Sequence, residues 1–132
     1  MPTETDWTLL ADAARAASAN AYAPYSRFAV GAAVLAADGR LFSGCNVENA
    51  SFGLTICAER VAAGAAVANG DKEFTAIAVV SRGGVSPCGA CRQFLAEFCP
   101  NLLIVMVDSL KPSEVHYATL DQLLPGRFEG PT

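Results

Sequence analysis

The sequence lacks the features that mark exported, membrane-bound or nucleic-acid-binding proteins. It has a single histidine and a single tryptophan among 132 residues, and its 9 lysines and arginines face 13 aspartates and glutamates, a net charge of −4. No stretch is apolar for long enough to span a bilayer, and no basic segment followed by an apolar run opens the chain. We therefore expect a cytoplasmic protein that has no membrane partner.

The shortage of basic residues also argues against a polynucleotide substrate. Proteins that bind nucleic acid tightly and without sequence preference have a basic surface, because neutralising phosphates supplies most of that affinity. The single histidine, His116, limits histidine-based catalysis to one candidate. We expect a small-molecule substrate and no nucleic-acid partner.

The composition is that of a compact globular chain. Hydrophobic residues make up 52% and charged residues 17% of the sequence, and a chain of this length can bury a core without disulfides. We expect a single domain over residues 1–132. The five cysteines are an odd number in a chain without an export signal, which fits reduced thiols or metal ligands better than a disulfide framework.

Helical segments alternate with pairs of apolar strands along the chain. Spacings of three and four predict a first helix over 7–21, and capping signals predict helices over 56–69 (N-cap Thr55), from Ser86 to before Pro100, and from Thr119. Strands are predicted over 28–36, 40–45, 74–80, 102–107 and, as a short edge, 115–117. This order indicates a layered α/β fold with a mixed sheet.

The segments that carry chemistry are residues 57–60 (CAER) and 87–93 (PCGACRQ). We expect Cys57 and Cys88 at the second position of their helices, where the helix dipole and free N–H groups favour thiolate. Cys91 follows Cys88 by three residues, so both sulfurs lie on one face. Three thiolates favour zinc, and a zinc site with three protein ligands keeps its fourth position for a water or hydroxide, as catalytic sites do.

The charged residues beside these cysteines suggest further roles. Glu59 is two residues from Cys57, off its helix face, but side chains lean toward the helix N-terminus, so Glu59 can reach the metal-bound water as a proton shuttle. Three thiolates around Zn²⁺ leave a net charge of −1, which a guanidinium bonded to the sulfurs would offset. Arg60 is the first candidate for this role; Arg92 and Gln93 are weaker ones.

Other chemistries share parts of this pattern. A Cys-x-x-Cys pair at a helix start also occurs in thiol–disulfide oxidoreductases. A non-catalytic zinc-binding module would need a fourth protein ligand, for which Cys45 and Cys99 are available, although neither has paired ligand spacing. The third cysteine beside Glu59 favours a metal-assisted hydrolase.

With these residues identified, the chain closely resembles the small homotetrameric cytidine deaminases. The zinc-deaminase signature, Cys-x-Glu followed by Pro-Cys-x-x-Cys, is a known one. The resemblance also covers residues 22–28 (YAPYSRF), 30–33 (VGAA), 44–49 (GCNVEN) and 123–128 (LLPGRF). It implies a three-layer α/β/α sandwich around a five-stranded mixed sheet and one zinc ion per subunit. It also implies hydrolysis of cytidine and deoxycytidine to uridine and deoxyuridine with release of ammonia, a step of pyrimidine salvage.

The resemblance also implies roles for residues outside the metal segments. Phe28 would pack against the pyrimidine, Asn46 and Glu48 would hydrogen-bond the ribose, and the N–H of Ala58 would contact the base carbonyl. Phe52 and Phe128 would enter the pocket of a neighbouring subunit in a homotetramer. The nearest rival is a deaminase of a cytosine-containing nucleoside antibiotic such as blasticidin S, which shares the metal segments.

Overall fold

The structure, a computed structural model, describes residues 4–131, with side chains from residue 7 onward. Its helices are α1 (Glu4–Ser18), the 3-10 helix η1 (Phe52–Leu54), α2 (Ala58–Ala68), α3 (Gly89–Ala96) and α4 (Leu120–Leu123). Its strands are β1 (Val30–Ala36), β2 (Leu41–Cys45), β3 (Phe74–Ser81), β4 (Leu103–Asp108) and β5 (Lys111–Thr119).

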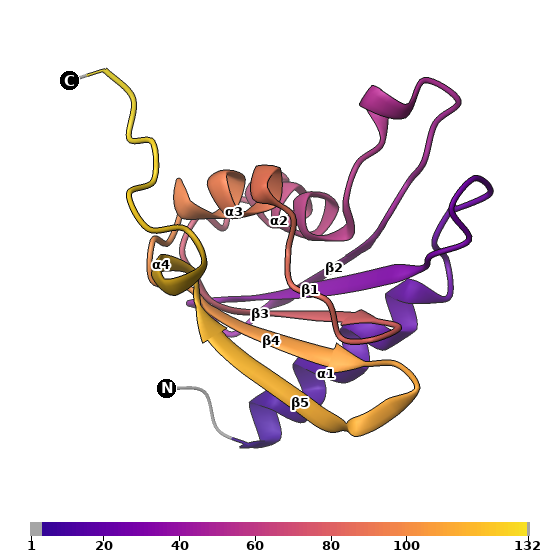
Figure 1. The fold of residues 1–132 in the computed structure, drawn as a ribbon. Helices are drawn as coiled ribbons and strands as arrows, with labels where there is room; N and C mark the ends of the chain where they lie inside the picture. Colours follow the sequence, from indigo (N-terminus) through magenta and orange to yellow (C-terminus); the bar gives the residue numbers. More distant parts are fainter. Residues whose placement is uncertain (1–3, 132) are drawn as a thin grey trace.

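The five strands form one mixed sheet in the order β2-β1-β3-β4-β5. Only β3 and β4 are parallel; the other neighbouring strands are antiparallel. In Figure 1, α1 covers one face of the sheet, and α2 and α3 lie side by side on the other. The prediction of a three-layer α/β/α sandwich around a five-stranded mixed sheet is confirmed.

A separate hydrophobic core fills each space between the layers. Leu10 and Ala14 of α1 pack against the face formed by Ala33, Ala78 and Val80. On the opposite face the fully buried residues that α2 contributes to the core are all alanines, Ala58, Ala62, Ala63 and Ala66. A methyl group at Gly44 of β2 would lie 2.6 Å from the backbone nitrogen of Ala62. Small residues on both elements therefore let α2 approach the sheet closely, which fixes the position of its N-terminus.

Two helices begin later than the sequence predicts. The helix predicted from Ile56 starts at Ala58, with Cys57 rather than Thr55 at the N-cap, because Ile56 is held extended by two backbone hydrogen bonds to Val47. The helix predicted from Ser86 starts at Gly89, with Cys88 at the N-cap. The prediction that both cysteines occupy the second helical position was therefore wrong.

The ends of the other elements differ less. Helix α1 ends at Ser18 rather than at residue 21, and the short edge strand predicted over 115–117 is the nine-residue β5. The predicted capping box at Thr119 is confirmed, with the Thr119 N–H donating to Oε1 of Gln122 at 3.0 Å. None of the helices described is long and apolar enough to cross a membrane.

Candidate zinc-binding site

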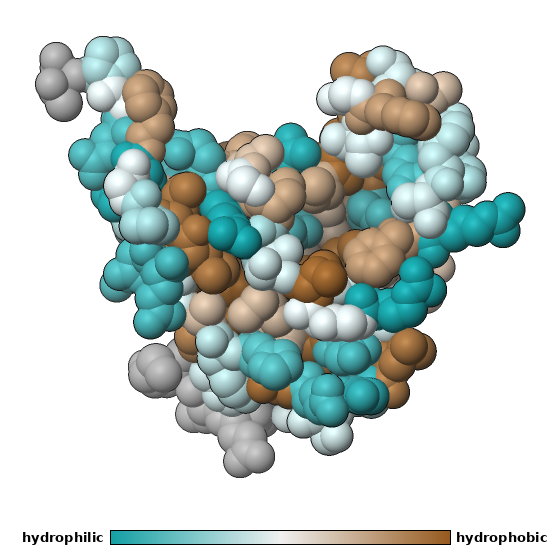
Figure 2. Space-filling model, in the orientation of Figure 1, coloured by the Kyte–Doolittle hydropathy of each residue, from teal (hydrophilic) through white to brown (hydrophobic). Residues whose placement is uncertain are grey.

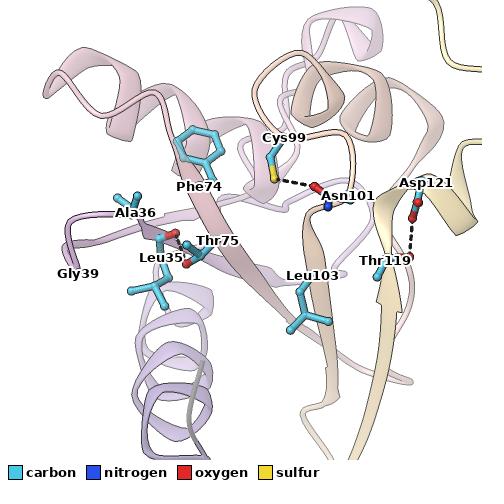
Figure 3. A pocket seen from close by; sticks show the side chains of 11 residues that line it. Leu35, Ala36, Gly39, Phe74, Thr75, Cys99, Asn101, Leu103, Thr119 and Asp121 are labelled. Carbon is cyan, nitrogen blue, oxygen red and sulfur yellow. Dashed lines mark hydrogen bonds between the residues drawn. The ribbon is translucent and has the colours of Figure 1, made fainter. Parts of the chain in front are cut away.

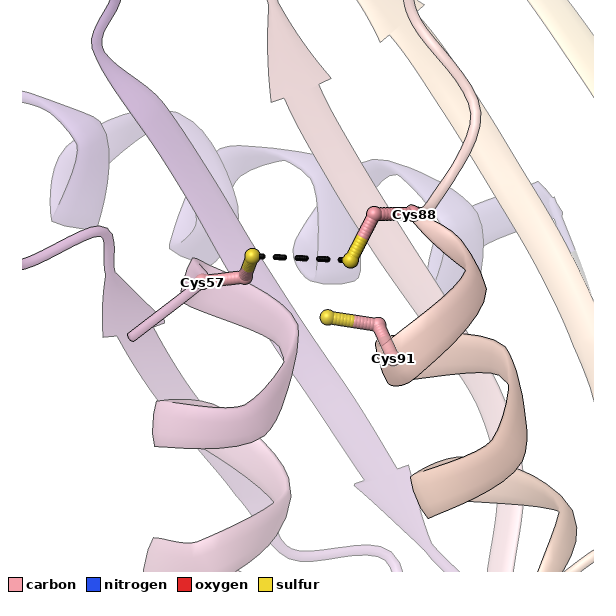
Figure 4. Close-up of side chains that lie close together, drawn as sticks. All are labelled: Cys57, Cys88 and Cys91. Atoms are coloured by element: carbon pink, nitrogen blue, oxygen red, sulfur yellow. Dashed lines mark hydrogen bonds between the residues drawn. The ribbon is translucent and has the colours of Figure 1, made fainter. Parts of the chain in front are cut away.

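Three cysteines from two separate segments converge between the N-termini of α2 and α3. The Sγ atoms of Cys57, Cys88 and Cys91 lie within 4.8 Å of one another, and those of Cys57 and Cys88 are 3.6 Å apart. Figure 4 shows the three side chains pointing into the same space, Cys57 from the start of α2 and the other two from the start of α3. Among the side chains that the structure describes, from residue 7 to residue 131, no other His, Cys, Asp or Glu residues form such a group.

The local backbone explains why these sulfurs meet. Cys57 and Cys88 are both N-caps with extended backbone, at φ −73°, ψ 152° and φ −67°, ψ 166°. An N-cap side chain normally accepts a hydrogen bond from the first turn, but neither sulfur does so here. Both thiols are thus left free for another ligand, at the positive ends of two helices.

The sulfurs are electrostatically coupled to one another. Hydrogen bonding from Cys91, supported by Arg60, lowers the pKa of the Cys57 thiol to about 5. The same hydrogen bond to Cys57, together with burial and the charge of Glu59, raises the pKa of Cys91. The group of sulfurs therefore favours the thiolate form of Cys57, and thiolate is the form of cysteine that binds metal.

Glu59 lies beside the cluster and is almost completely buried, with 4% of its surface exposed. Burial raises the pKa of its carboxyl group, and the negative charge of Cys57 adds to this effect. Glu59 is close enough to Cys57 and Cys91 for both sulfurs to act on its pKa. A carboxyl group with a raised pKa next to a metal site is suited to accept and release protons during a reaction.

Arg60 holds the position expected of a charge-compensating residue. Its Nη2 donates to Sγ of Cys57 at 3.7 Å, and interaction with the sulfurs raises the pKa of the guanidinium, most strongly through Cys57. Its Nε is buried and has no hydrogen-bond partner among the residues described. The guanidinium is thus a permanent positive charge committed to the sulfur cluster.

Arg92 and Gln93, the weaker candidates for that role, have other hydrogen-bond partners. Arg92 donates to the carbonyl oxygens of Pro87 and Leu123 at 2.7 and 2.8 Å, and to Oγ of Ser86 at 3.0 Å. The side-chain amide of Gln93 bonds the backbone of Phe128. Both residues connect chain segments, and neither has a hydrogen bond to a sulfur among those that the structure gives.

The residues expected to bind the pyrimidine and ribose lie at the start of β1 and just beyond β2. Phe28 is half-buried, and the guanidinium of Arg82 stands over its ring, 5.5 Å from the centroid. Asn46 is buried, accepts from the N–H of Val30 at 2.9 Å and donates to the carbonyl of Phe28 at 2.8 Å. Asn46 therefore holds the backbone on either side of residue 29, which includes the backbone that carries the Phe28 side chain.

Glu48 binds the loop that precedes β1. Its Oε1 accepts from the N–H groups of Tyr25 and Ser26 at 2.9 and 3.1 Å, and its Oε2 accepts from the Ser26 hydroxyl. These hydrogen bonds, the Ser26 hydroxyl first, lower the pKa of Glu48. The carboxylate borders a pocket of about 280 Å³ that is also lined by Tyr25, Ser26, Phe52 and Thr55.

The remaining predicted residues divide into one buried and two exposed positions. Ala58 is fully buried at the first position of α2, where its N–H has no acceptor within the helix. Phe52, on η1, and Phe128, near the C-terminus, are 72% and 71% exposed. Phe52 contacts only the edge of Tyr25 among the rings of the described residues, at 5.6 Å between centroids. Their roles in substrate binding remain predictions.

The cluster fits a zinc ion. Three sulfur donors within 4.8 Å of one another can bind one ion, and thiolates prefer zinc to magnesium or calcium. A structural zinc site would need a fourth protein ligand, for which Cys45 and Cys99 were the candidates. Both are half-buried thiols that lie outside the cluster. Three protein ligands leave one coordination position open, as in catalytic zinc sites.

Comparison with protein families shows the family to which the chain belongs. Residues 4–107 match the family described as the cytidine and deoxycytidylate deaminase zinc-binding region. The chain belongs to this deaminase family. A cytidine deaminase of Sporosarcina psychrophila is 51% identical over 110 residues, 82% of this chain and 80% of the relative.

A solved structure shares the fold of this deaminase. The crystal structure of cytidine deaminase from Burkholderia pseudomallei matches with a TM-score of 0.88 and 46% identity, covering 96% of this chain and all of that one. A blasticidin-S deaminase of Bacillus cereus is 31% identical over 109 residues, 75% of this chain and 76% of the relative. The thiol oxidoreductase alternative is thereby excluded, since the cysteine segments are those of a zinc-binding deaminase family.

A large hollow in this deaminase lies away from Cys57, Cys88 and Cys91. It has a volume of about 860 Å³ and is lined by the starts of β3 and β4, among them Phe74 and Leu103, as well as by Cys99 (Figure 3). Cys88 and Cys91 instead follow the C-terminal end of β3, and Cys57 lies beside them. Cys99 donates there to Oδ1 of Asn101, and burial raises its pKa, so this thiol is not activated.

Some contacts of the deaminase site were not predicted. The binding of Glu48 to Tyr25 and Ser26, and the stacking of Arg82 on Phe28, join residues at least 22 positions apart. Local spacing carries no signal for such pairs. Most of these residues lie in the motif segments 22–28 and 44–49. The presence of both segments in the family resemblance was the one signal in the sequence that could have indicated that they are in contact.

Proposed function

We propose that this chain is a zinc-dependent cytidine deaminase that hydrolyses cytidine and deoxycytidine to uridine and deoxyuridine and releases ammonia, as in pyrimidine salvage. The observation that carries the proposal is the buried Glu59 beside a cluster of three cysteine sulfurs with one coordination position to spare. The cluster needs reduced thiols, which suits a reducing compartment such as the cytoplasm.

Each part of the site has a task in this reaction. A zinc ion held by Cys57, Cys88 and Cys91 supplies a Lewis acid that lowers the pKa of a water in the open position, to about 7 in other zinc enzymes. Glu59 accepts a proton from the attacking water and gives it to N3 of the cytosine ring, which makes C4 electrophilic. The water oxygen then bonds to C4.

The same carboxylate completes the reaction. Glu59 takes the second proton from the oxygen now bonded to C4 and gives it to the amino group. The C4–N bond breaks, ammonia leaves, and the C4 carbonyl of the uracil ring remains. Water and cytidine are consumed, uridine and ammonia are formed, and Glu59 returns to its starting state. Burial of Glu59 supports both transfers, because it excludes bulk water and raises the pKa of the carboxyl group.

Arg60 keeps the site from becoming too negative. Three thiolates outweigh one Zn²⁺ by a single charge, and this excess opposes deprotonation of a bound water. The guanidinium bonded to Cys57 offsets the excess and fixes the orientation of that sulfur. A lysine there would present a single point charge instead of the planar fork that bonds a ligand and fills a buried site.

The substrate class follows from the residues around Phe28. The Phe28 ring provides a face for a pyrimidine, and the polar groups of Asn46 and Glu48 lie on the adjoining segment, where a ribose would bind. In this arrangement the ribose hydroxyls compete with Tyr25 and Ser26 for the Glu48 carboxylate. Glu48 thus favours a nucleoside over the free base.

A substrate comparison tests this assignment. We expect cytidine and deoxycytidine to be deaminated with kcat/KM at least about 100-fold above blasticidin S, since hydrogen-bonding pockets reject analogues that leave their polar groups unpaired. For each substrate, the rate is measured at fixed enzyme concentration as the loss of absorbance of its cytosine ring. Preference for the antibiotic would favour the rival assignment, and release of ammonia from none of the three would reject deamination altogether.

We infer that the working form is a homotetramer in which subunits share pockets. Phe52, Leu54 and Phe128 are large apolar residues that are 65% or more exposed. The segments that carry them, η1 and the C-terminal tail, form two protrusions on either side of α2 and α3 (Figure 1). Figure 2 shows a hollow between these protrusions. A second copy of the chain would fill this hollow, and its protrusions would reach the neighbouring site.

Sedimentation of the purified chain tests the assembly. We expect a particle of four 13.7 kDa chains at the concentrations used for activity assays. Dilution should lower the specific activity once dissociation begins, because each pocket loses the residues of its neighbour. A monomer with full activity would contradict the shared pocket.

A further inference from the structure

The C-terminal segment is attached to the rest of the chain at few points. Residues 125–131 follow α4 without regular secondary structure, and the ion pair between Arg127 and Glu129 is internal to the segment. Among the residues described, only Gln93 has hydrogen bonds that connect this segment to the rest of the chain. The direction in which Phe128 points therefore depends on one side chain of α3.

Gln93 binds Phe128 as a neighbouring strand would. Its Nε2 donates to the carbonyl oxygen of Phe128 at 2.9 Å, and its Oε1 accepts from the Phe128 N–H at 3.3 Å. Both backbone groups of this residue are thus satisfied by one amide. Since the Phe128 ring is 71% exposed, contacts of the ring within its own chain contribute little to its orientation.

Arg92 attaches the preceding part of the segment to the same helix. Its guanidinium joins the carbonyl of Leu123, at the end of α4, to Pro87 and Ser86, directly before the metal-ligand candidate Cys88. Arg92 and Gln93 immediately follow Cys91. One turn of α3 therefore connects two of the sulfurs to the C-terminal segment.

We propose that Gln93 is a positioning residue that holds Phe128 ready to enter the substrate pocket of a second copy of the chain, with Arg92 as its structural support. This inference depends on the proposed function, in which Phe128 completes a neighbouring pocket. Gln93 touches neither the substrate nor the reacting atoms. It keeps the segment in the binding-competent conformation, so that ordering it costs no binding energy when substrate arrives.

Replacing Gln93 by alanine should weaken substrate binding without impairing chemistry. When only a fraction of the protein is in the conformation that binds substrate, the apparent affinity for substrate is reduced by that fraction. For Gln93→Ala we expect KM for cytidine to rise about tenfold and kcat to stay within about threefold. Zinc content should remain at one ion per chain, since Cys57, Cys88 and Cys91 are unchanged.

Two further measurements separate positioning from general damage. The Phe128 amide should exchange with solvent faster in Gln93→Ala than in the unaltered protein, since its acceptor is lost. In a Phe128→Ala background, Gln93→Ala should leave KM unchanged, because coupled residues are not additive. Gln93→Glu keeps the acceptor and loses the donor to the carbonyl, so it should give an intermediate KM and replaces Gln93→Ala if the alanine variant loses zinc.

Each outcome decides part of the proposal. Unchanged exchange of the Phe128 amide would show that Gln93 does not hold the segment and would overturn the inference. Faster exchange with an unchanged KM would overturn the role of Phe128 in the pocket, while deamination by the unaltered protein would still support the proposed function. Faster exchange with raised KM, lost in the Phe128→Ala background, supports the inference in full.

Discussion

Replacing Glu59 by glutamine is expected to lower kcat for cytidine by at least about 1,000-fold, or roughly 4 kcal/mol in the barrier, while each chain keeps its zinc. Glutamine has nearly the same shape but cannot take a proton from water or return one to the amino group. The buried position of Glu59 leaves no bulk water to substitute for it. Steady-state rates and metal analysis of the same sample measure both effects.

A matched carboxylate serves as the control for this variant. Glu97 is an exposed residue at the C-terminal end of α3, and Glu97→Gln removes the same charge without touching the cluster. We expect its kcat to stay within about twofold, as for surface changes in general. A Glu59→Gln protein that retained activity within tenfold of the original would remove Glu59 from the mechanism.

Replacing Cys88 by alanine should release the metal and abolish deamination. Two of the three sulfurs, Cys57 and Cys91, remain, and two ligands do not bind zinc tightly at a site built for three. Because binding energy at a preformed metal site adds to the free energy of unfolding, the melting temperature should fall as well. Metal analysis after gel filtration and thermal unfolding measure the two effects.

Cys99 provides the control for loss of a thiol. It is half-buried near the end of the same helix and lies outside the cluster. Cys99→Ala should keep one zinc per chain and nearly full activity, although removal of a partly buried sulfur costs some stability. Unchanged zinc content in Cys88→Ala would contradict its role as a ligand.

The candidate metal-binding residues could be predicted from the sequence because their signal is local. Spacing identified Cys57, Cys88 and Cys91 as one group, and the sulfurs meet as expected. Capping rules misplaced the helix starts by two residues or more, since Ile56 is drawn into a bridge with Val47. Cys57 and Cys88 are therefore N-caps rather than second helical residues. Thiolate is still favoured at both, because an N-cap also lies at the positive end of a helix.

Contacts between distant segments could not be predicted in this way. Arg92 and Gln93 were weaker candidates for bonding the sulfurs, yet they bond Leu123 and Phe128, 31 and 35 residues downstream. The packing of α3 against the C-terminal segment decides which hydrogen-bond donors and acceptors form pairs. The fold is easier to predict than these pairs, because alternating apolar strands and helices already restrict it to a layered α/β arrangement.

Release of ammonia from cytidine as a function of bound zinc is the most direct test that this chain is a zinc-dependent deaminase. Purified protein is stripped with a chelator, zinc is returned in steps, and metal content and the rate of uridine formation are determined in each sample. We expect no turnover without metal and a rate of uridine formation that rises in proportion to zinc up to one ion per chain. Turnover by zinc-free protein, or none by the fully loaded protein, would contradict this proposal.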